Sequence, residues 1–327
     1  MTSATTNEAL DIVYALATSP AFASDGTCFA ARSSGLYGST DGGVTWRPLY
    51  GSLNLAAALP TSSVVVSPTY AADHTLFAAT QNAVLRSFNG GKSWEVVLLP
   101  APPPLIVSLA ISPAFDRDSV LFAATAADGV YHSADRGNRW VGWNFGLYDL
   151  NILCLAISPD FAADETVYAG SESGVFRSSN GGRAWRELPF PPDWGPVLCL
   201  ALSPNYSLDR ETGVVFAGTE SRGLLRSADH GQSWERVGED AIPADANSVL
   251  LTPQFPARRE LLVLAGGRVL LSRDGGEMWA DITPQMAQGR GLTCAAAPGG
   301  FEPGAPLLVG LDDGTVLNLA FPDSGSA

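Results

Sequence analysis

The chain carries little positive charge. Lysine and arginine together number 19 among 327 residues, and Lys92 is the single lysine. Aspartate and glutamate number 33, which gives a formal net charge of −14 and a pI of about 4.5. Nucleic-acid backbones and anionic membranes attract clusters of basic side chains. Because this sequence has no basic run, it argues against both as partners.

Long apolar runs are absent too. No apolar segment approaches the ~18 residues that a membrane-spanning helix requires. The first ten residues carry no basic side chain ahead of the first apolar stretch, unlike a secretory signal. We therefore expect a soluble, cytoplasmic protein that does not insert into membranes.

Cysteine and histidine are scarce, with four and three copies. The cysteines fall in apolar segments, where a free thiol behaves as a small hydrophobe, so we expect four reduced core cysteines: Cys28, Cys154, Cys199 and Cys294. No Cys-x-x-Cys pair occurs. The histidines occupy unrelated positions, His74, His132 and His230. The sequence therefore predicts no metal site and no cofactor.

The main feature of the sequence is a repeated pattern. A pattern with Ser first, Asp or Asn third, Gly fifth and Trp eighth occurs six times. Its third and eighth residues are Asp41 and Trp46, Asn89 and Trp94, Asp135 and Trp140, Asn180 and Trp185, Asp229 and Trp234, and Asp274 and Trp279. A second marker, a proline after Ser, Thr or Ala, recurs at intervals of 45 to 49 residues, at residues 20, 68, 113, 159, 204, 253 and 298. A strand-bearing period of about 45 residues is typical of a β-propeller with one blade per repeat.

The fourth repeat shows the predicted layout of a blade. Its apolar run is typical of a strand covered on both faces, and proline ends it because proline cannot donate to a strand ladder. The predicted elements are an inner strand at 152–158, a turn at 160–165, strands at 166–170 and 175–178, and an outer strand that begins near Trp185. In the turn, we expect the recurring aromatic residue to pack on the blade edge and the recurring acid to accept turn amides.

The seventh repeat is shorter. It has predicted strands at 292–297, 307–311 and 315–321 but no motif tryptophan, so one blade lacks its outer strand. We expect the polar segment Thr2 to Asn7 to supply that strand and close the ring; the alternative is a three-stranded last blade. No linker divides the repeats. The sequence thus predicts one all-β domain over residues 1–327, a seven-bladed propeller of four-stranded antiparallel blades.

The repeated motif has a mechanical explanation. Its Ser and its Asp or Asn can accept backbone amides of their own turn. Because Asn89 and Asn180 replace Asp in two copies, the pattern favours a hydrogen-bonded turn over a calcium site. The tryptophan is expected to wedge between neighbouring sheets.

The motif as it stands at Ser39 to Trp46, S-T-D-G-G-V-T-W, resembles the Asp-box or BNR repeat. That element occurs in sialidases, xyloglucanases, sortilin-type receptors and the photosystem II assembly factor family. The wider unit from Leu155 to Trp185 resembles bacterial BNR-like propellers. The resemblance extends over nearly the whole chain and implies the propeller fold. It implies little about activity, since the Asp box of those families lies away from the ligand site and one scaffold hosts many functions.

An enzymatic site has weak support. The resemblance to sialidases would require three arginines with a Tyr–Glu pair, and the arginines on predicted inter-strand turns, Arg32, Arg222 and Arg268, have none in recognisable order. A glycoside hydrolase needs two carboxylates across a cleft. The candidates on the turns are Asp128, Glu172, Glu220, Asp312 and Asp313. We interpret them as solvated turn residues and assign no catalytic residue.

Two tryptophans lie outside the motif, Trp143 and Trp194. Both fall in connections between blades, the first with Phe145 and Tyr148, the second with Phe190. One interpretation is that these rings pack on their own blade. The other is that they form a contact patch, since Trp and Tyr are enriched at the energetic centres of interfaces.

Acidic residues accompany these aromatics in the connecting loops. Asp149, Asp193, Glu239 and Asp240 would steer a partner that carries Lys or Arg. We therefore predict a non-catalytic scaffold that binds a protein or peptide through its rim loops. The alternative is a glycoside hydrolase or carbohydrate-binding propeller.

Overall fold

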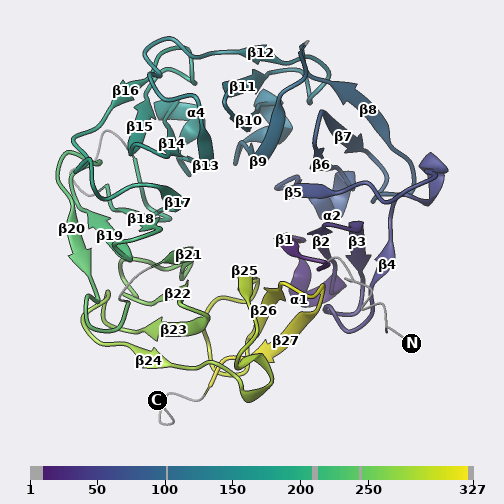
Figure 1. The fold of residues 1–327 in the computed structure, drawn as a ribbon. Helices are drawn as coiled ribbons and strands as arrows, with labels where there is room; N and C mark the ends of the chain where they lie inside the picture. Colours follow the sequence, from purple (N-terminus) through teal and green to yellow (C-terminus); the bar gives the residue numbers. More distant parts are fainter. Residues whose placement is uncertain (1–9, 101, 208–212, 243–244, 323–327) are drawn as a thin grey trace, which may run out of the picture.

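Seven small β-sheets stand round a central axis as the blades of a propeller (Figure 1). The computed structural model describes residues 10–100, 102–207, 213–242 and 245–322. Six sheets have four antiparallel strands in chain order, and the seventh has three strands within these ranges. The predicted seven-bladed propeller is confirmed.

The blades follow one another along the chain. Blades 1 and 2 contain β1 (Val13–Thr18), β2 (Cys28–Arg32), β3 (Gly35–Ser39) and β4 (Arg47–Pro48), then β5 (Thr61–Val66), β6 (Leu76–Thr80), β7 (Ala83–Ser87) and β8 (Glu95–Leu98). Blades 3 and 4 contain β9 (Leu105–Ile111), β10 (Leu121–Ala126), β11 (Gly129–Ser133) and β12 (Val141–Gly142), then β13 (Ile152–Ile157), β14 (Val167–Ser171), β15 (Val175–Ser178) and β16 (Arg186–Glu187). Blades 5 and 6 contain β17 (Val197–Leu202), β18 (Val215–Thr219), β19 (Leu224–Ser227) and β20 (Glu235–Val237), then β21 (Ala246–Leu251), β22 (Leu261–Ala265), β23 (Arg268–Ser272) and β24 (Ala280–Asp281). Blade 7 contains β25 (Leu292–Ala296), β26 (Pro306–Leu311) and β27 (Val316–Ala320).

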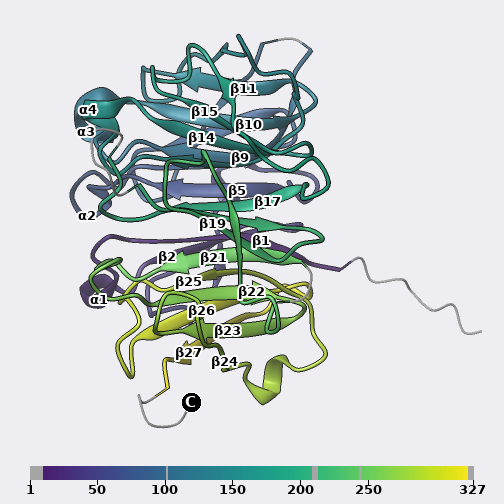
Figure 2. The same ribbon diagram turned by 90° about the vertical axis from the view of Figure 1, so that its left-hand side faces the viewer.

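Short helices follow the inner strands. Where a turn was predicted, blades 1 to 4 form one helical turn, α1 (Phe22–Asp25), α2 (Tyr70–Asp73), α3 (Phe115–Asp118) and α4 (Phe161–Asp164). Figure 2 shows all four on one face of the ring, which we call the helix face. Two 3-10 helices, η1 (Gly51–Leu53) and η2 (Gln285–Ala287), lie in connections between blades.

The recurring acid ties each of these helical turns together, as predicted. In α1, the Ser19 hydroxyl donates to one oxygen of the Asp25 carboxylate at 2.6 Å, and the Thr27 amide donates to the other at 2.8 Å. Asp73, Asp118 and Asp164 accept the equivalent bonds in the next three blades. The aromatic residue that begins each helix is buried.

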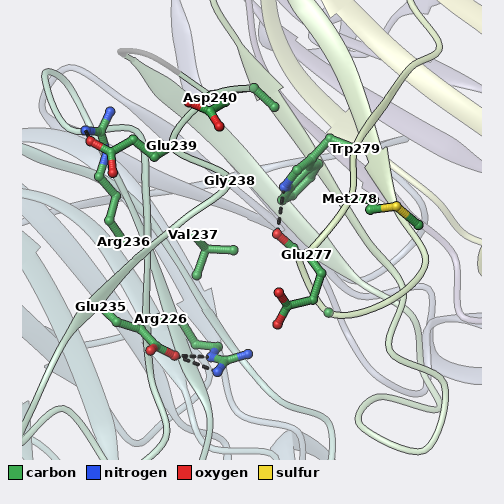
Figure 3. Close-up of a pocket in the computed structure, with 13 residues that line it drawn as sticks. Arg226, Glu235, Arg236, Val237, Gly238, Glu239, Asp240, Glu277, Met278 and Trp279 are labelled. Carbon is green, nitrogen blue, oxygen red and sulfur yellow. Dashed lines mark hydrogen bonds and ion pairs between the residues drawn. The ribbon is translucent and has the colours of Figure 1, made fainter.

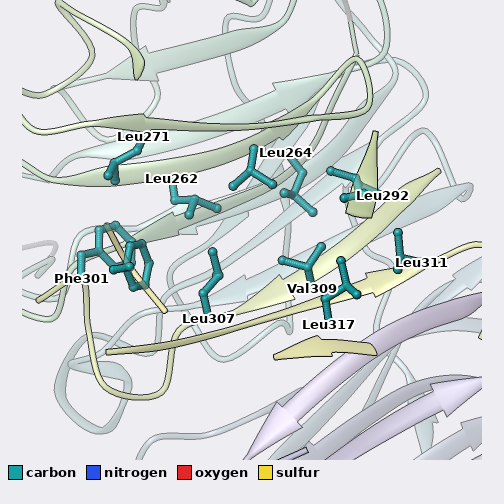
Figure 4. Packing of buried hydrophobic residues seen from close by; sticks show 12 residues of the cluster. Leu262, Leu264, Leu271, Leu292, Phe301, Leu307, Val309, Leu311 and Leu317 are labelled. Carbon is teal, nitrogen blue, oxygen red and sulfur yellow. The ribbon is translucent and has the colours of Figure 1, made fainter. Parts of the chain in front are cut away.

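The hydrophobic core lies between blades. In five interfaces an aromatic ring of the second strand meets the aromatic residue of the following blade's turn edge-on, at centroid distances of 5.5 to 5.9 Å: Phe29–Tyr70, Phe77–Phe115, Phe122–Phe161, Tyr168–Tyr206 and Phe216–Phe255. Between blades 6 and 7 the corresponding cluster is mainly aliphatic, with Phe301 at one end (Figure 4). Each blade therefore buries its apolar faces only against its neighbours.

The six Ser-x-Asp/Asn-x-Gly-x-x-Trp segments, here called motif turns, join the third strand to the fourth. In each, the Ser hydroxyl oxygen accepts the amide of the glycine four residues on. Asn180 accepts the Ala184 amide at 2.9 Å, as Asp41 accepts the Thr45 amide. Because Asn and Asp make the same bond, the turn requires an oxygen acceptor rather than a charge.

Motif turns also connect to the helix face and to the preceding blade. The Gly42 amide donates to the Gly26 carbonyl at 2.9 Å, with equivalent bonds in later blades. The Trp185 indole N–H donates to the Trp143 carbonyl of blade 3 at 2.7 Å. The predicted wedge between sheets is thus present.

Blade 7 meets blade 1 through hydrogen bonds that cross the ring junction. The Thr293 hydroxyl donates to the Val13 carbonyl at 2.5 Å, and the Asn318 amide donates to the Gly42 carbonyl at 2.6 Å. Cys294 donates weakly to the same Val13 carbonyl, while Cys154 and Cys199 make the equivalent contact between blades 4, 5 and 6. All four cysteines are free, as predicted.

The predicted pairing of Thr2 to Asn7 with blade 7 lies outside the described residues and stays a prediction. Deleting residues 1–8 should lower the melting temperature by several degrees, because β27 would lose its outer partner strand. Differential scanning calorimetry of the full-length and truncated chains tests this. Equal melting temperatures would favour a three-stranded last blade.

Substitution of Trp185 by Ala should destabilise the protein by about 3–5 kcal/mol, because the ring is 5% exposed and bonds across two blades. Urea unfolding followed by circular dichroism measures the loss. Trp46 is the matched control, since it occupies the same motif position, is half-buried and bonds only within its own turn. Because Trp46 also packs between blades, against Leu308, the comparison isolates the burial and the cross-blade hydrogen bond of Trp185. A loss for Trp46→Ala as large as that for Trp185→Ala would contradict the importance assigned to them.

Candidate functional site

The position three residues after each motif tryptophan is apolar in every copy: Leu49, Val97, Trp143, Leu188, Val237 and Ile282. At four of these positions the backbone amide donates to the third strand of the same blade, at 2.9 to 3.0 Å. Leu49, Trp143, Leu188 and Val237 also contact the motif glycine of the next blade closely enough that a Cβ there would meet their side chains within 3.6 Å. Trp143 therefore occupies a position that recurs in every repeat, and it fills this position with a larger side chain than the other copies have.

Trp143 is held between blades 3 and 4. Its ring stacks on His132 with centroids 3.9 Å apart and planes within 9°, and Arg183 lies over it at 5.4 Å. Burial, reinforced by the positive charge of Arg183, lowers the pKa of His132 to about 4. His132 thus packs as a neutral ring at neutral pH.

The next residues of the connection present two aromatic rings to solvent. Phe145 is 79% exposed and Tyr148 is 83% exposed. Their backbone is anchored, because the Phe145 carbonyl accepts the Trp185 amide at 2.8 Å and Asp149 accepts the Ser173 amide at 2.9 Å. We call residues 143–151 the blade 3–4 connection. It offers exposed rings on a fixed backbone.

Phe190 and Trp194 lie in the following connection, between blades 4 and 5. Both are half-buried. Phe190 meets Trp234 edge-on at 5.5 Å, and Trp194 packs on the same cluster. Asp193 forms an exposed ion pair with Arg222 at 2.9 Å. These residues fill an interface between blades and leave only part of each ring accessible.

The candidate arginines each have a partner of their own. Arg222 pairs with Asp193, Arg268 donates to the Ala241 carbonyl, and Arg32 stacks over Tyr37. The five turn carboxylates, Asp128, Glu172, Glu220, Asp312 and Asp313, stand on four different blades. None of them lines the cavity between blades 5 and 6 or four further cavities at blades 1 and 2.

Asp313 lacks the electrostatics of an acid catalyst. The hydrogen bond from Arg290 holds the pKa of Asp313 at about 2, so it stays ionised at neutral pH. In the part of the chain that the structure describes, no group of three or more His, Cys, Asp or Glu could hold a metal ion. No helix within the same ranges is long and apolar enough to cross a membrane.

A cavity of about 630 Å³ lies between blades 5 and 6, where β20 and the residues after it face the motif turn of blade 6 (Figure 3). We call it the blade 5–6 groove. Val237 and Trp279 lie toward its floor, and Glu235, Glu239, Asp240 and Glu277 surround it. Glu239 and Asp240 were predicted as acidic rim residues; their place in a cavity was not visible from sequence.

No protein-family model and no curated protein matches the chain. Solved structures do match. YCF48 bound to a D1 peptide is 16% identical with a TM-score of 0.69, covering 98% of this chain and 95% of that one. A GH74 xyloglucanase from Xanthomonas campestris is 20% identical with a TM-score of 0.71, covering 94% of this chain but 52% of its own length.

The extracellular domain of BT4673 from B. thetaiotaomicron is 14% identical with a TM-score of 0.67, covering 96% of this chain and 39% of that one. At these identities the likenesses show a shared fold. This chain corresponds to the whole length of the YCF48 propeller and to about half of the xyloglucanase.

The buried His132 should make the protein acid-sensitive between pH 6.5 and pH 4. Its pKa is lower in the folded than in the unfolded chain, so the unfolded chain takes up the proton first and stability falls as the pH falls through this window. The loss of unfolding free energy should be about 3 kcal/mol. His132→Phe should keep the stack on Trp143 and remove this part of the pH dependence. Urea unfolding at several pH values measures it, and an unchanged pH dependence would be the contrary result.

Proposed function

We propose that this protein is a non-catalytic interaction scaffold that binds a protein or peptide partner on the blade 3–4 connection and its neighbour. The observation that carries the proposal is the exposure of Phe145 and Tyr148 on an anchored backbone. Aromatic rings on a backbone that is already fixed lose less conformational entropy on binding than rings on a mobile loop, and they supply large contact areas. Trp143, which packs between blades 3 and 4, begins the same connection.

Phe190 and Trp194 extend the proposed surface toward blade 5. Adjacent blades bring the two connections side by side round the perimeter (Figure 1). Asp149 and Asp193 add negative charge beside the aromatic rings, which favours a partner that carries Lys or Arg. The formal net charge of −14 would steer the same partner toward the protein.

A structural neighbour supports a peptide-binding role. YCF48, which shares this fold over nearly its full length, has been seen bound to a D1 peptide. That observation belongs to YCF48, and it supports the proposal here because the two chains share the propeller fold over nearly the whole of the aligned lengths.

Phe145→Ala/Tyr148→Ala should weaken capture of the partner at least about tenfold, since truncation of one hot-spot aromatic costs roughly 2 kcal/mol. Immobilised wild type and double variant are compared in cell extract by quantitative mass spectrometry. The binding of each captured protein is then measured with purified components. Trp143→Ala/Trp194→Ala, measured beside it, reports on the inner part of the surface.

Val44→Ala/Val96→Ala is the matched control, because Val44 and Val96 are 72% and 55% exposed and lie outside the connection. It should bind like the wild type. Partners that bind the wild type and the Phe145→Ala/Tyr148→Ala variant with equal affinity would overturn the proposed surface.

The alternative, a glycoside hydrolase or carbohydrate-binding propeller, draws support from the xyloglucanase fold. The turn carboxylates support it less, because hydrolysis requires a pair of carboxylates facing each other across a cleft and none of the five lines a described cavity. Release of reducing sugar from xyloglucan by the purified protein, abolished by Asp312→Asn/Asp313→Asn, would replace the scaffold proposal.

A further inference from the structure

The blade 5–6 groove arises where the outer strand of blade 5 ends. Gly238 follows β20 with φ of +65°, a conformation that favours glycine. A Cβ at this position would lie 2.3 Å from the Trp279 indole nitrogen. Glycine therefore lets the backbone pass close to the indole of Trp279 as it turns at the edge of the cavity.

The same place between blades 1 and 2 provides an internal comparison. There the cavity is about 220 Å³, against about 630 Å³ between blades 5 and 6. Position by position, Arg47 corresponds to Glu235 and Lys92 to Glu277, while Gly51 and Ser52 correspond to Glu239 and Asp240. The fold produces a shallow recess at both places. The recess between blades 5 and 6 is the larger of the two, and acidic side chains line it where the other has basic or small residues.

Of the four carboxylates that line the groove, two form ion pairs within the described ranges and two do not. Glu235 pairs with Arg226 at 2.5 Å, and Glu239 pairs with Arg236 at 2.6 Å. Asp240 and Glu277 are exposed and form no ion pair with any residue of the described ranges. Beside them, Met278 is 75% exposed, and its flexible thioether adapts to different apolar partners.

We propose that the blade 5–6 groove binds an extended peptide segment in which two basic side chains flank an apolar one. Asp240 and Glu277 accept the basic side chains, and the apolar side chain lies on Met278 and Trp279. The cavity volume falls in the range of about 300–1,000 Å³ that ligand sites in proteins occupy. The carboxylates of the groove would repel the phosphates of a nucleic acid and attract basic side chains. A basic peptide is therefore the occupant that we propose. This site shares no residue with the blade 3–4 connection.

Fluorescence anisotropy with the labelled peptide Arg-Ala-Leu-Ala-Arg tests the proposal. The wild type should bind it, should bind Glu-Ala-Leu-Ala-Glu at least about tenfold more weakly, and should lose affinity as salt is added. Asp240→Asn/Glu277→Gln should weaken binding of the arginine peptide about tenfold or more, which is 1.4 kcal/mol. Met278→Ala should weaken binding of this peptide but not of Arg-Ala-Gly-Ala-Arg.

Asp128→Asn/Glu172→Gln is the matched control, because it removes the same charge from exposed turn positions outside the groove. It should bind the peptide as the wild type does. Glu277→Lys, which copies the chemistry of the blade 1–2 recess, should shift the preference toward the glutamate peptide. All variants alter exposed side chains, and circular dichroism checks that they remain folded.

The outcomes separate this proposal from the preceding one. Phe145→Ala/Tyr148→Ala should bind the arginine peptide like the wild type even if it has lost its protein partner. Failure of the wild type to bind the arginine peptide, equal binding of the glutamate peptide, or equal weakening by the control variant would overturn the groove as a basic-peptide site.

Discussion

The contact between neighbouring blades is the interaction on which this structure depends. A single four-stranded sheet has two apolar faces and cannot cover either alone. Each blade therefore buries its faces against the next, through edge-on aromatic pairs such as Phe122–Phe161 and Tyr168–Tyr206. The ring must close for the first and last blades to do the same, and the bonds from blade 7 to Val13 and Gly42 cross that junction.

This constraint leaves few positions free to vary. The inner strands, the helical turns and the motif turns all serve packing or local hydrogen bonding. The residues after each outer strand are less restricted, since they lie at the perimeter where one blade gives way to the next. Five residues after the motif tryptophan the chain has Phe145 between blades 3 and 4, Phe190 between blades 4 and 5, and Glu239 between blades 5 and 6. The same structural position is thus occupied by an exposed aromatic side chain, by a half-buried one, or by a carboxylate that lines a groove.

Trp143 shows where sequence reasoning stopped short. Counting tryptophans against motif copies set it apart as an unexplained residue. Its position, three residues after Trp140, is the same as that of Leu49 and Leu188. In the structure it makes the same contacts as they do, with the third strand of its own blade and with the motif glycine of the next blade. The signal was present, because all six copies are apolar at this position. The groove had no such signal, since its walls come from residues some 40 positions apart on two blades.

The sequence by itself determined the number of blades, the order of strands, the motif turns and the free state of the cysteines. These follow from local rules: strand periodicity, proline at strand ends, and side chains that bond their own turn. Only the tertiary structure decided which aromatic residues face solvent and which carboxylates share a cavity. That choice depends on how one blade is placed against the next and on which side chain stands at each repeat position, and the repeat pattern fixes the position but not the exposure of its side chain.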